Sequence, residues 1–237
     1  MDLGLHGKVA LVTAASRGLG FASARALVDE GANVAICARG EDALRAAAAE
    51  LGGQVLAIPT DVTQPDAPRR LVDATVARFG ALHVLVANAG GPPKARAIDV
   101  DDATLQAAID ANLLTSVRLV RESLSHLRAA GWGRICLITS SAVKQPIPEL
   151  ATSNTARTGL WGWAKTAAQD LVDEGITLNL ACPGLHRTAR VVETGLDGRM
   201  GDPSDFGKVV AFLCSEPAGF ISGVALQIDG AGTLGLL

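Results

Sequence analysis

Short apolar runs alternate with longer segments of helical period along the whole chain. The runs are rich in Val, Ile, Leu and Ala and nearly continuous in their hydrophobicity, as expected of strands buried on both faces of a sheet. They read KVALVT, NVAICA, QVLAIPTD, LHVLVANAG, RICLITS, ITLNLAC and VALQID. We therefore predict seven β-strands.

The segments between the runs place apolar residues at the spacing of amphipathic helices. Expected helices are GFASARALVDEGA, EDALRAAAAELG and residues 65–79, 101–129, 153–173 and 204–214. A helix that joins two consecutive buried strands favours a parallel sheet covered on both faces. With no linker or internal repeat in the sequence, we expect one α/β domain over residues 1–237, a doubly wound, Rossmann-like sheet.

Composition narrows the class of partner. The chain has 237 residues and a net charge of −3, and its basic residues are scattered, so we expect neither nucleic acid nor a membrane surface as partner. Its N-terminus lacks the basic region and long apolar run of a secretion signal, and no segment reaches the roughly 20 apolar residues of a membrane span. The expected partner is a small molecule.

The cysteines favour a reducing compartment and no metal site. Their spacing is neither that of a disulfide framework nor that of a zinc site, so we expect buried thiols in a cytoplasmic protein. The four are Cys37, Cys136, Cys182 and Cys214.

The first strand is followed by a small-residue turn that opens a helix. It reads Thr13-Ala14-Ala15-Ser16-Arg17-Gly18-Leu19-Gly20. Glycines there let the backbone approach a pyrophosphate, and the free N–H groups of a helix N-terminus favour phosphate charge. A tight packing turn without a ligand is the alternative interpretation. Ala14 stands where a dinucleotide fingerprint has its first glycine, and it is strained if the turn needs a positive φ.

Arg39 follows the second strand, where an NAD-binding fold places an acidic residue on the ribose hydroxyls. Together with Arg17 it has the guanidinium chemistry that binds a 2′-phosphate. The sequence therefore predicts NADP(H) in preference to NAD(H), unless these two are solvated surface arginines.

At this point the sequence resembles the short-chain dehydrogenases/reductases, and more narrowly their 3-oxoacyl-carrier-protein reductase-like branch. Asp61-Val62 resembles the pair that contacts adenine, and Asn88-Ala89-Gly90 resembles the motif after the fourth strand. Asn112 matches the family's helix asparagine. Pro183-Gly184 with Thr188 is similar to the segment that holds the nicotinamide carboxamide, and Ile228-Asp229-Gly230 to the closing strand.

The resemblance breaks at the catalytic residues, because the chain contains no tyrosine. The family uses a serine, a tyrosine as general acid/base and a lysine, and these positions correspond to Ser140, Ser153 and Arg157. A serine alcohol is a far weaker acid than tyrosine, and arginine stays charged, so neither replaces the tyrosine as acid. Arg157 can bind the ribose or stabilise an oxyanion, and water relayed through Ser140, Ser153 and Asn112 is the expected proton source.

Other residues are weaker candidates for the missing acid, and we expect bystander roles for them: Lys144, Glu149, Cys182 and His186. Trp161 and Trp163 are expected in the core or at a subunit contact. The segment over residues 188–201 is shorter than the flap that many members of the resembled family fold over the substrate, which predicts an open cleft or a bulky substrate.

Three functional classes remain open. The first is an NADPH-dependent reductase or dehydrogenase of a carbonyl or alcohol substrate with a rebuilt proton relay. The second is an NADP(H)-binding sensor or scaffold without redox turnover, and the third a cofactor-independent, non-redox enzyme on the same scaffold. The resemblance also implies a homodimer or homotetramer.

Overall fold

The computed structural model describes residues 1–196 and 198–236, which form a parallel sheet of seven strands. The strands are β1 (Val9–Val12), β2 (Asn33–Ala38), β3 (Val55–Pro59), β4 (Val84–Ala87), β5 (Gly133–Ile138), β6 (Ile176–Pro183) and β7 (Ala225–Ile228). Their order across the sheet is β3-β2-β1-β4-β5-β6-β7. The predicted doubly wound sheet is confirmed.

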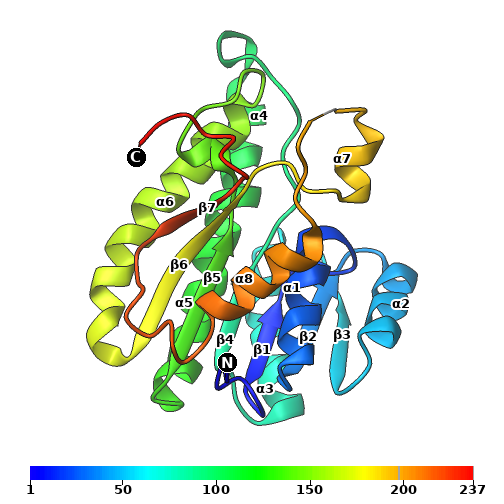
Figure 1. Cartoon of the computed structure of the whole chain (residues 1–237), viewed down its shortest axis with the longest axis vertical. Coiled ribbons are helices and arrows are strands. Elements are labelled where there is room, and N and C mark those ends of the chain that lie inside the picture. Colours follow the sequence, from blue (N-terminus) through cyan, green and yellow to red (C-terminus); the bar gives the residue numbers. More distant parts are fainter. Residues whose placement is uncertain (197, 237) are drawn as a thin grey trace.

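Helices cover both faces of this sheet (Figure 1). They are α1 (Gly18–Asp29), α2 (Glu41–Leu51), α3 (Ala67–Phe79), α4 (Asp102–Ile109), α5 (Thr115–Ala129), α6 (Ala151–Leu171), α7 (Ala189–Glu193) and α8 (Pro203–Leu213). One core lies under α1, α2 and α8, and the other under α3, α5 and α6. In β1, Leu11 points into the second core and its neighbours Ala10 and Val12 into the first, which is why the strand is apolar throughout.

The helix expected over residues 101–129 contains an interruption. The structure has α4, then a π-helical turn at Asp110–Leu114, then α5. The Thr115 hydroxyl donates to the Asp110 carbonyl at 2.9 Å and so satisfies a group that the wider turn frees. A single wide turn leaves the apolar period of its neighbours almost unchanged, so the sequence pattern did not reveal it. Such turns are frequent at functional sites, and Asn112 lies at the centre of this one.

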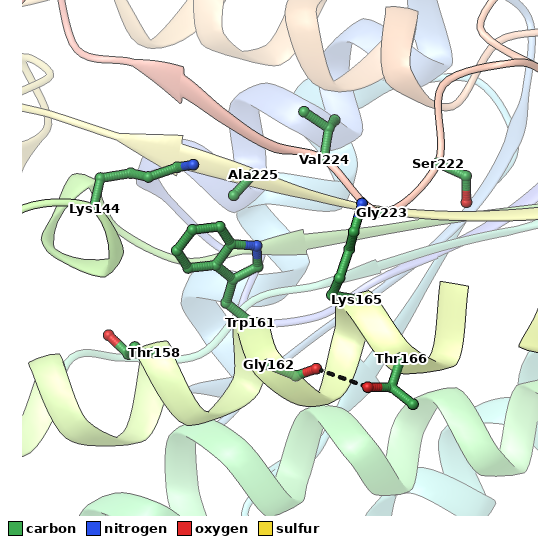
Figure 2. A pocket seen from close by; sticks show the side chains of 10 residues that line it. All are labelled: Lys144, Thr158, Trp161, Gly162, Lys165, Thr166, Ser222, Gly223, Val224 and Ala225. Atoms are coloured by element: carbon green, nitrogen blue, oxygen red, sulfur yellow. Dashed lines mark hydrogen bonds between the residues drawn. The ribbon is translucent and has the colours of Figure 1, made fainter. Parts of the chain in front are cut away.

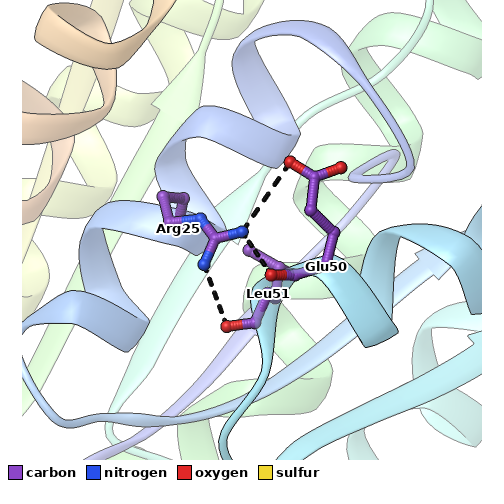
Figure 3. Close-up of polar contacts among 3 residues, drawn as sticks. All are labelled: Arg25, Glu50 and Leu51. Carbon is purple, nitrogen blue, oxygen red and sulfur yellow. Dashed lines mark hydrogen bonds and ion pairs between the residues drawn. The ribbon is translucent and has the colours of Figure 1, made fainter.

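Arg25 connects the first two helices on one face (Figure 3). From α1 its guanidinium donates to the carbonyls of Glu50 and Leu51, the last two residues of α2, and it lies 3.8 Å from the Glu50 carboxylate. A cation at a helix C-terminus satisfies free carbonyls and complements the helix dipole.

The two halves of the sheet diverge at β1 and β4, which are neighbours in the sheet but distant in the sequence. A ligand crevice is expected beyond the carboxyl ends of strands at such a point. No helix in residues 1–196 and 198–236 is long and apolar enough to cross a lipid bilayer.

Candidate functional site

Side-chain hydrogen bonds fasten the carboxyl ends of β1 and β4 together. The Thr13 hydroxyl donates to the Asn88 carbonyl at 2.7 Å and accepts from the Asn88 N–H at 2.8 Å. The Asn88 amide donates to the carbonyl of Ala14 at 3.2 Å. Thr13 is fully buried by this arrangement, so its hydroxyl positions the turn instead of facing a ligand.

The turn after β1 has the tight geometry that the glycine pattern predicted. A Cβ on Gly20 would lie 2.6 Å from the Ala14 carbonyl oxygen and 2.8 Å from the Asn88 amide, so only glycine fits there. Gly18 begins α1 with a φ of +65°. Arg17 precedes it without a side-chain cap, so the first N–H groups of α1 keep the hydrogen-bonding capacity that phosphate requires.

The predicted 2′-phosphate end lies after β2 and β3. Arg17 and Arg39 are both exposed. The Asp61 carboxylate accepts hydrogen bonds from the Thr63 N–H and hydroxyl at 3.0 and 2.8 Å. These bonds, chiefly that from the N–H, and the charge of Arg39 hold the pKa of Asp61 below its usual value. Arg39 and Asp61 are thus neighbours at the edge where adenine is expected.

Arg157 occupies a buried position between α6 and the end of β5. Its Nη1 donates to the carbonyls of Ile138 and Thr139 at 3.1 and 2.8 Å, and only 7% of the residue is exposed. Burial, followed by the positive charge of Arg190, lowers the pKa of Arg157 to about 10. The guanidinium is therefore a cation at neutral pH and a positioned hydrogen-bond donor, and it is not a proton source.

Ser140, Ser153 and Asn112 contribute the other polar groups. The Ser140 hydroxyl accepts from the Ala142 N–H at 3.1 Å, which leaves its own proton available to a ligand. Ser153 is 8% exposed and lies one helical turn before Arg157. The Asn112 amide donates to the Ala108 carbonyl at 3.4 Å, and its Oδ1 is buried without a hydrogen-bond partner among the described residues. An unpaired buried acceptor of this kind favours a bound water or ligand group.

The loop after β4 connects the two ends of the site. Beyond Asn88, Ala89 and Gly90 it reaches Pro93, whose carbonyl accepts from the Thr152 hydroxyl at 3.0 Å. Because Thr152 directly precedes Ser153, this contact joins the loop to the start of α6.

The segment after β6 lies across from the glycine turn. The Gly184 N–H donates to the Ile228 carbonyl at 3.0 Å, and a Cβ on Gly184 would lie 2.7 Å from the Asp229 Cβ. Thr188 caps α7 by accepting from the Val191 N–H at 3.4 Å. Its methyl group lies 3.7 Å from the place of a Cβ on Gly18. Thr188 therefore stands beside the turn that is expected to hold the pyrophosphate.

The structure gives His186 and Cys182 packing roles. His186 is 4% exposed, its ring centroid lies 5.2 Å from that of Phe206, and its Nδ1 is 3.2 Å from the Gly184 carbonyl oxygen. Cys182 lies in the core, and burial raises the pKa of its thiol to about 11. Both side chains are thus buried and engaged in contacts with the protein itself.

Lys144 lies beside a groove outside the predicted site. Its Nζ is 4.1 Å from the centroid of the Trp161 ring. Figure 2 shows the two side chains next to each other in this groove, and Trp161 and Trp163 both pack against the core under α6. Glu149 is exposed, with a φ of +61°. The groove is lined by Lys144, Thr158, Trp161, Gly162, Lys165, Thr166 and residues 222–225.

Sequence reasoning missed Arg190. A Cβ on Gly91 would lie 2.8 Å from Arg190 Nη1, so the guanidinium reaches from α7 to the loop after β4. In the segment over residues 188–201, residue 197 lies outside the described residues. Gly201, at the end of this segment, forms a β-bridge with His186, which precedes it. No motif in the sequence marks Arg190, because its place depends on a contact between two segments that are distant along the chain. In the described part of the chain, no three His, Cys, Asp or Glu side chains come together as a metal site.

Comparisons with known proteins agree with this geometry. The family model for short chain dehydrogenases matches residues 8–197. Cis-4-hydroxycyclohexanecarboxylate dehydrogenase of Sinomonas cyclohexanicum is 33% identical over 240 residues, which cover 95% of this chain and 96% of that protein. The 3-oxoacyl-acyl-carrier-protein reductase of Synechocystis sp. is 33% identical, with 95% and 97% covered. The crystal structure of L-sorbose reductase from Gluconobacter frateurii, complexed with NADPH and L-sorbose, superposes with a TM-score of 0.92 at 30% identity and covers 97% of this chain and 98% of that one.

Proposed function

Because this chain belongs to the short chain dehydrogenase family, we propose that it is an NADPH-dependent reductase or dehydrogenase of a carbonyl or alcohol substrate. Its site has Ser153 and Arg157 in place of the family's tyrosine and lysine. The observation that carries the proposal is the buried Arg157 cation, which is bonded to the carbonyls of Ile138 and Thr139 directly before Ser140. The π-helical turn that packs against α6 adds the Asn112 Oδ1, which has no hydrogen-bond partner among the described residues. We further propose that the protein assembles as a homodimer or homotetramer.

The residues around the crevice fit a nicotinamide dinucleotide. The backbone of the turn at Ser16, Gly18, Leu19 and Gly20 would hold the pyrophosphate, because this turn has no room for a side chain at Gly20 and leads into free N–H groups of α1. Arg17 and Arg39 would bind the 2′-phosphate. Asp61 and Val62 would flank the adenine, and Asn88, Ala89 and Gly90 the adjoining ribose. Pro183, Gly184 and Thr188 would hold the nicotinamide end.

When bound, the cofactor supplies or accepts a hydride. The Ser140 hydroxyl then donates a hydrogen bond to the substrate oxygen, while the Arg157 guanidinium holds the ribose and favours negative charge nearby. A proton reaches the oxygen from water ordered by Ser153 and the Asn112 Oδ1. Since a positioned general acid is worth about 10²- to 10⁴-fold in rate, turnover should be slow for this family.

Two features favour a second candidate, an NADP(H)-binding protein without redox turnover. The tyrosine is absent, and Ala14 has a φ of +48°, a strained conformation in the cofactor turn. A third candidate is a cofactor-independent, non-redox enzyme, in which Ser140 and Arg157 polarise a carbonyl group directly.

One turnover experiment separates the three candidates. The purified protein is incubated with NADPH or NADP and a panel that includes the compounds named for the relatives, L-sorbose and cis-4-hydroxycyclohexanecarboxylate. The proposal predicts many cofactor molecules converted per subunit. Binding of cofactor without conversion would favour the second candidate, and product formed without any cofactor would favour the third.

Restoring the family's residues tests the role given to α6. We expect the double variant Ser153→Tyr, Arg157→Lys to raise kcat at least about tenfold, because it returns an acid whose pKa a neighbouring lysine lowers. The single variant Arg157→Lys is the matched control, because it alters the contacts to Ile138 and Thr139 in the same way but supplies no acid. Equal rates for the two variants, both folded, would show that the missing tyrosine does not limit the site.

A further inference from the structure

Arg190 lies exposed at the mouth of the crevice and has no carboxylate partner among the described residues. Its Nη1 and Nη2 lie 2.8 and 2.9 Å from the place where Gly91 would carry a Cβ. The side chain thus crosses from α7 to the loop after β4, and a bulkier residue than glycine at position 91 would displace it. The guanidinium of Arg190 can occupy this position because Gly91 has no side chain.

Gly91 belongs to the catalytic end of the crevice. It follows Asn88, which is bonded to the glycine turn, and precedes Pro93, whose carbonyl is bonded to Thr152 on α6. The guanidinium is also close enough to Arg157 for its charge to lower the pKa of that residue. Arg190 therefore lies close to the residues proposed to act on the substrate.

Within residues 1–196 and 198–236, neither Arg157 nor Arg190 forms an ion pair with a carboxylate. Arg157 is 7% exposed, and its protein acceptors are two backbone carbonyls, neither of which carries a charge. A buried cation is costly unless an anion or a full set of hydrogen bonds compensates it. The nearby second cation increases this cost. An anion bound near both guanidinium groups would offset this cost.

We propose that Arg190, with Arg157 behind it, binds a carboxylate group of the substrate. The substrates of the reductase proposed above would then be oxo acids and the corresponding hydroxy acids, an inference that rests on that proposed function. The planar fork of arginine suits a carboxylate, which it can bind through two parallel hydrogen bonds. The pyrophosphate of the cofactor is a poorer occupant, because the N-terminus of α1 provides for it at Gly18 and Gly20.

Binding of a carboxylate and its neutral isostere tests the proposal without turnover. Benzoate and benzamide have nearly the same shape and differ in charge, and calorimetry gives the affinity of each for the protein with and without NADPH. We expect benzoate to bind at least about tenfold more tightly than benzamide, as a charge-assisted pair would produce. Arg190→Gln should remove this preference. Arg187→Gln, in the same segment and exposed, is the matched control and should keep it.

Two results would overturn the proposal. One is a wild-type protein that binds benzoate no better than benzamide, or an Arg190→Gln variant that keeps the preference. The other is a loss of NADPH affinity of tenfold or more in Arg190→Gln, which would assign the side chain to the cofactor. Because these readouts measure binding, a protein that prefers benzoate yet never oxidises NADPH would refute the proposed reductase activity and leave the carboxylate site in place.

Discussion

Ala14 adopts a left-handed backbone conformation, with a φ of +48°, at the start of the cofactor turn. An L-residue with a Cβ is strained there by about 1–2 kcal/mol, whereas glycine is not. The surrounding contacts hold it in place, because its carbonyl accepts from Asn88 and a Cβ at Gly20 would touch the same carbonyl. The turn therefore keeps the family's geometry with a residue poorly suited to it.

Replacement of Ala14 by glycine should stabilise the protein. We expect a gain of about 1 kcal/mol, or a Tm higher by roughly 2–4 °C, because the strain is relieved without loss of a buried contact. Thermal unfolding followed by circular dichroism measures it. Ala15→Gly is the control and should lower the Tm, since Ala15 is fully buried and its φ is not positive. A lower Tm for Ala14→Gly would show that the alanine is not strained.

Arg39 is predicted to set the choice between the two nicotinamide dinucleotides. Arg39→Ala should weaken NADPH binding about tenfold or more and leave NADH binding nearly unchanged, because the guanidinium can pair with the 2′-phosphate only. Tryptophan fluorescence titrations with both cofactors provide the affinities. Arg45→Ala, which removes another exposed arginine nearby, should change neither. Equal losses for NADPH and NADH in Arg39→Ala would contradict this role.

At the residue scale, the sequence indicated which types of side chain the candidate site contains, but it did not indicate the contacts that these side chains make. Arg157 could be placed by its distance from Pro183 and Gly184 along the family pattern, but its bonds to the carbonyls of Ile138 and Thr139 depend on how α6 packs against β5. Arg190 carries no motif at all. It becomes a site residue because the α7 segment folds over a glycine from a distant loop, and pattern reasoning has no access to such a contact.

At the scale of elements, apolar periodicity predicted every strand and most helices, since it reports directly on burial. It failed at Asp110–Leu114, where a π-helical turn separates α4 from α5. One wide turn shifts the apolar pattern by less than one residue, yet it contains Asn112, whose Oδ1 has no hydrogen-bond partner among the residues that the structure describes. The functional feature of this helix was therefore its least predictable part.

The pairing of β1 with β4 includes a titratable contact. His83, just before β4, accepts a hydrogen bond at Nδ1 from the Val9 N–H at 3.0 Å, so this nitrogen must be unprotonated. Burial, and then the charge of Lys8, lowers the pKa of His83 from 6.5. The pKa of His83 is thus lower in the folded protein than in the unfolded chain. The stability that the neutral His83 contributes is therefore complete above pH 6.5 and is lost as the pH falls through the pKa of the folded protein.

We therefore expect the Tm to fall on acidification from pH 7 to pH 5 and expect His83→Gln to reduce that dependence, since a glutamine oxygen accepts the bond at either pH. Thermal melts at both values measure the difference. His126→Gln, at another partly buried histidine, should keep the wild-type dependence. A pH dependence that His83→Gln leaves unchanged would rule out this contact as its source.

At the scale of the whole molecule, the alternation of strands and helices was sufficient to predict a parallel sheet. A helix that joins two consecutive strands leaves few other ways to arrange those strands. The order β3-β2-β1-β4-β5-β6-β7 places the ends of β1, β4, β5 and β6 side by side. This explains how Gly18, Asn88, Ser140 and Thr188, distant in sequence, all lie at the carboxyl-end edge of the sheet. Substrate identity is beyond such reasoning, because it depends on loop contacts like that of Arg190 with Gly91.

We propose that this site transfers hydride without a tyrosine. The most direct measurement uses NADPH deuterated at the transferable position of the nicotinamide and follows the label into the alcohol product by mass spectrometry. We expect labelled product over several turnovers with the wild-type protein. The Ser140→Ala variant should lose most of this labelled product, and that loss would exclude a contaminating enzyme as its source. Unlabelled product, or no product although NADPH binds and the whole carbonyl panel is tested, would contradict it.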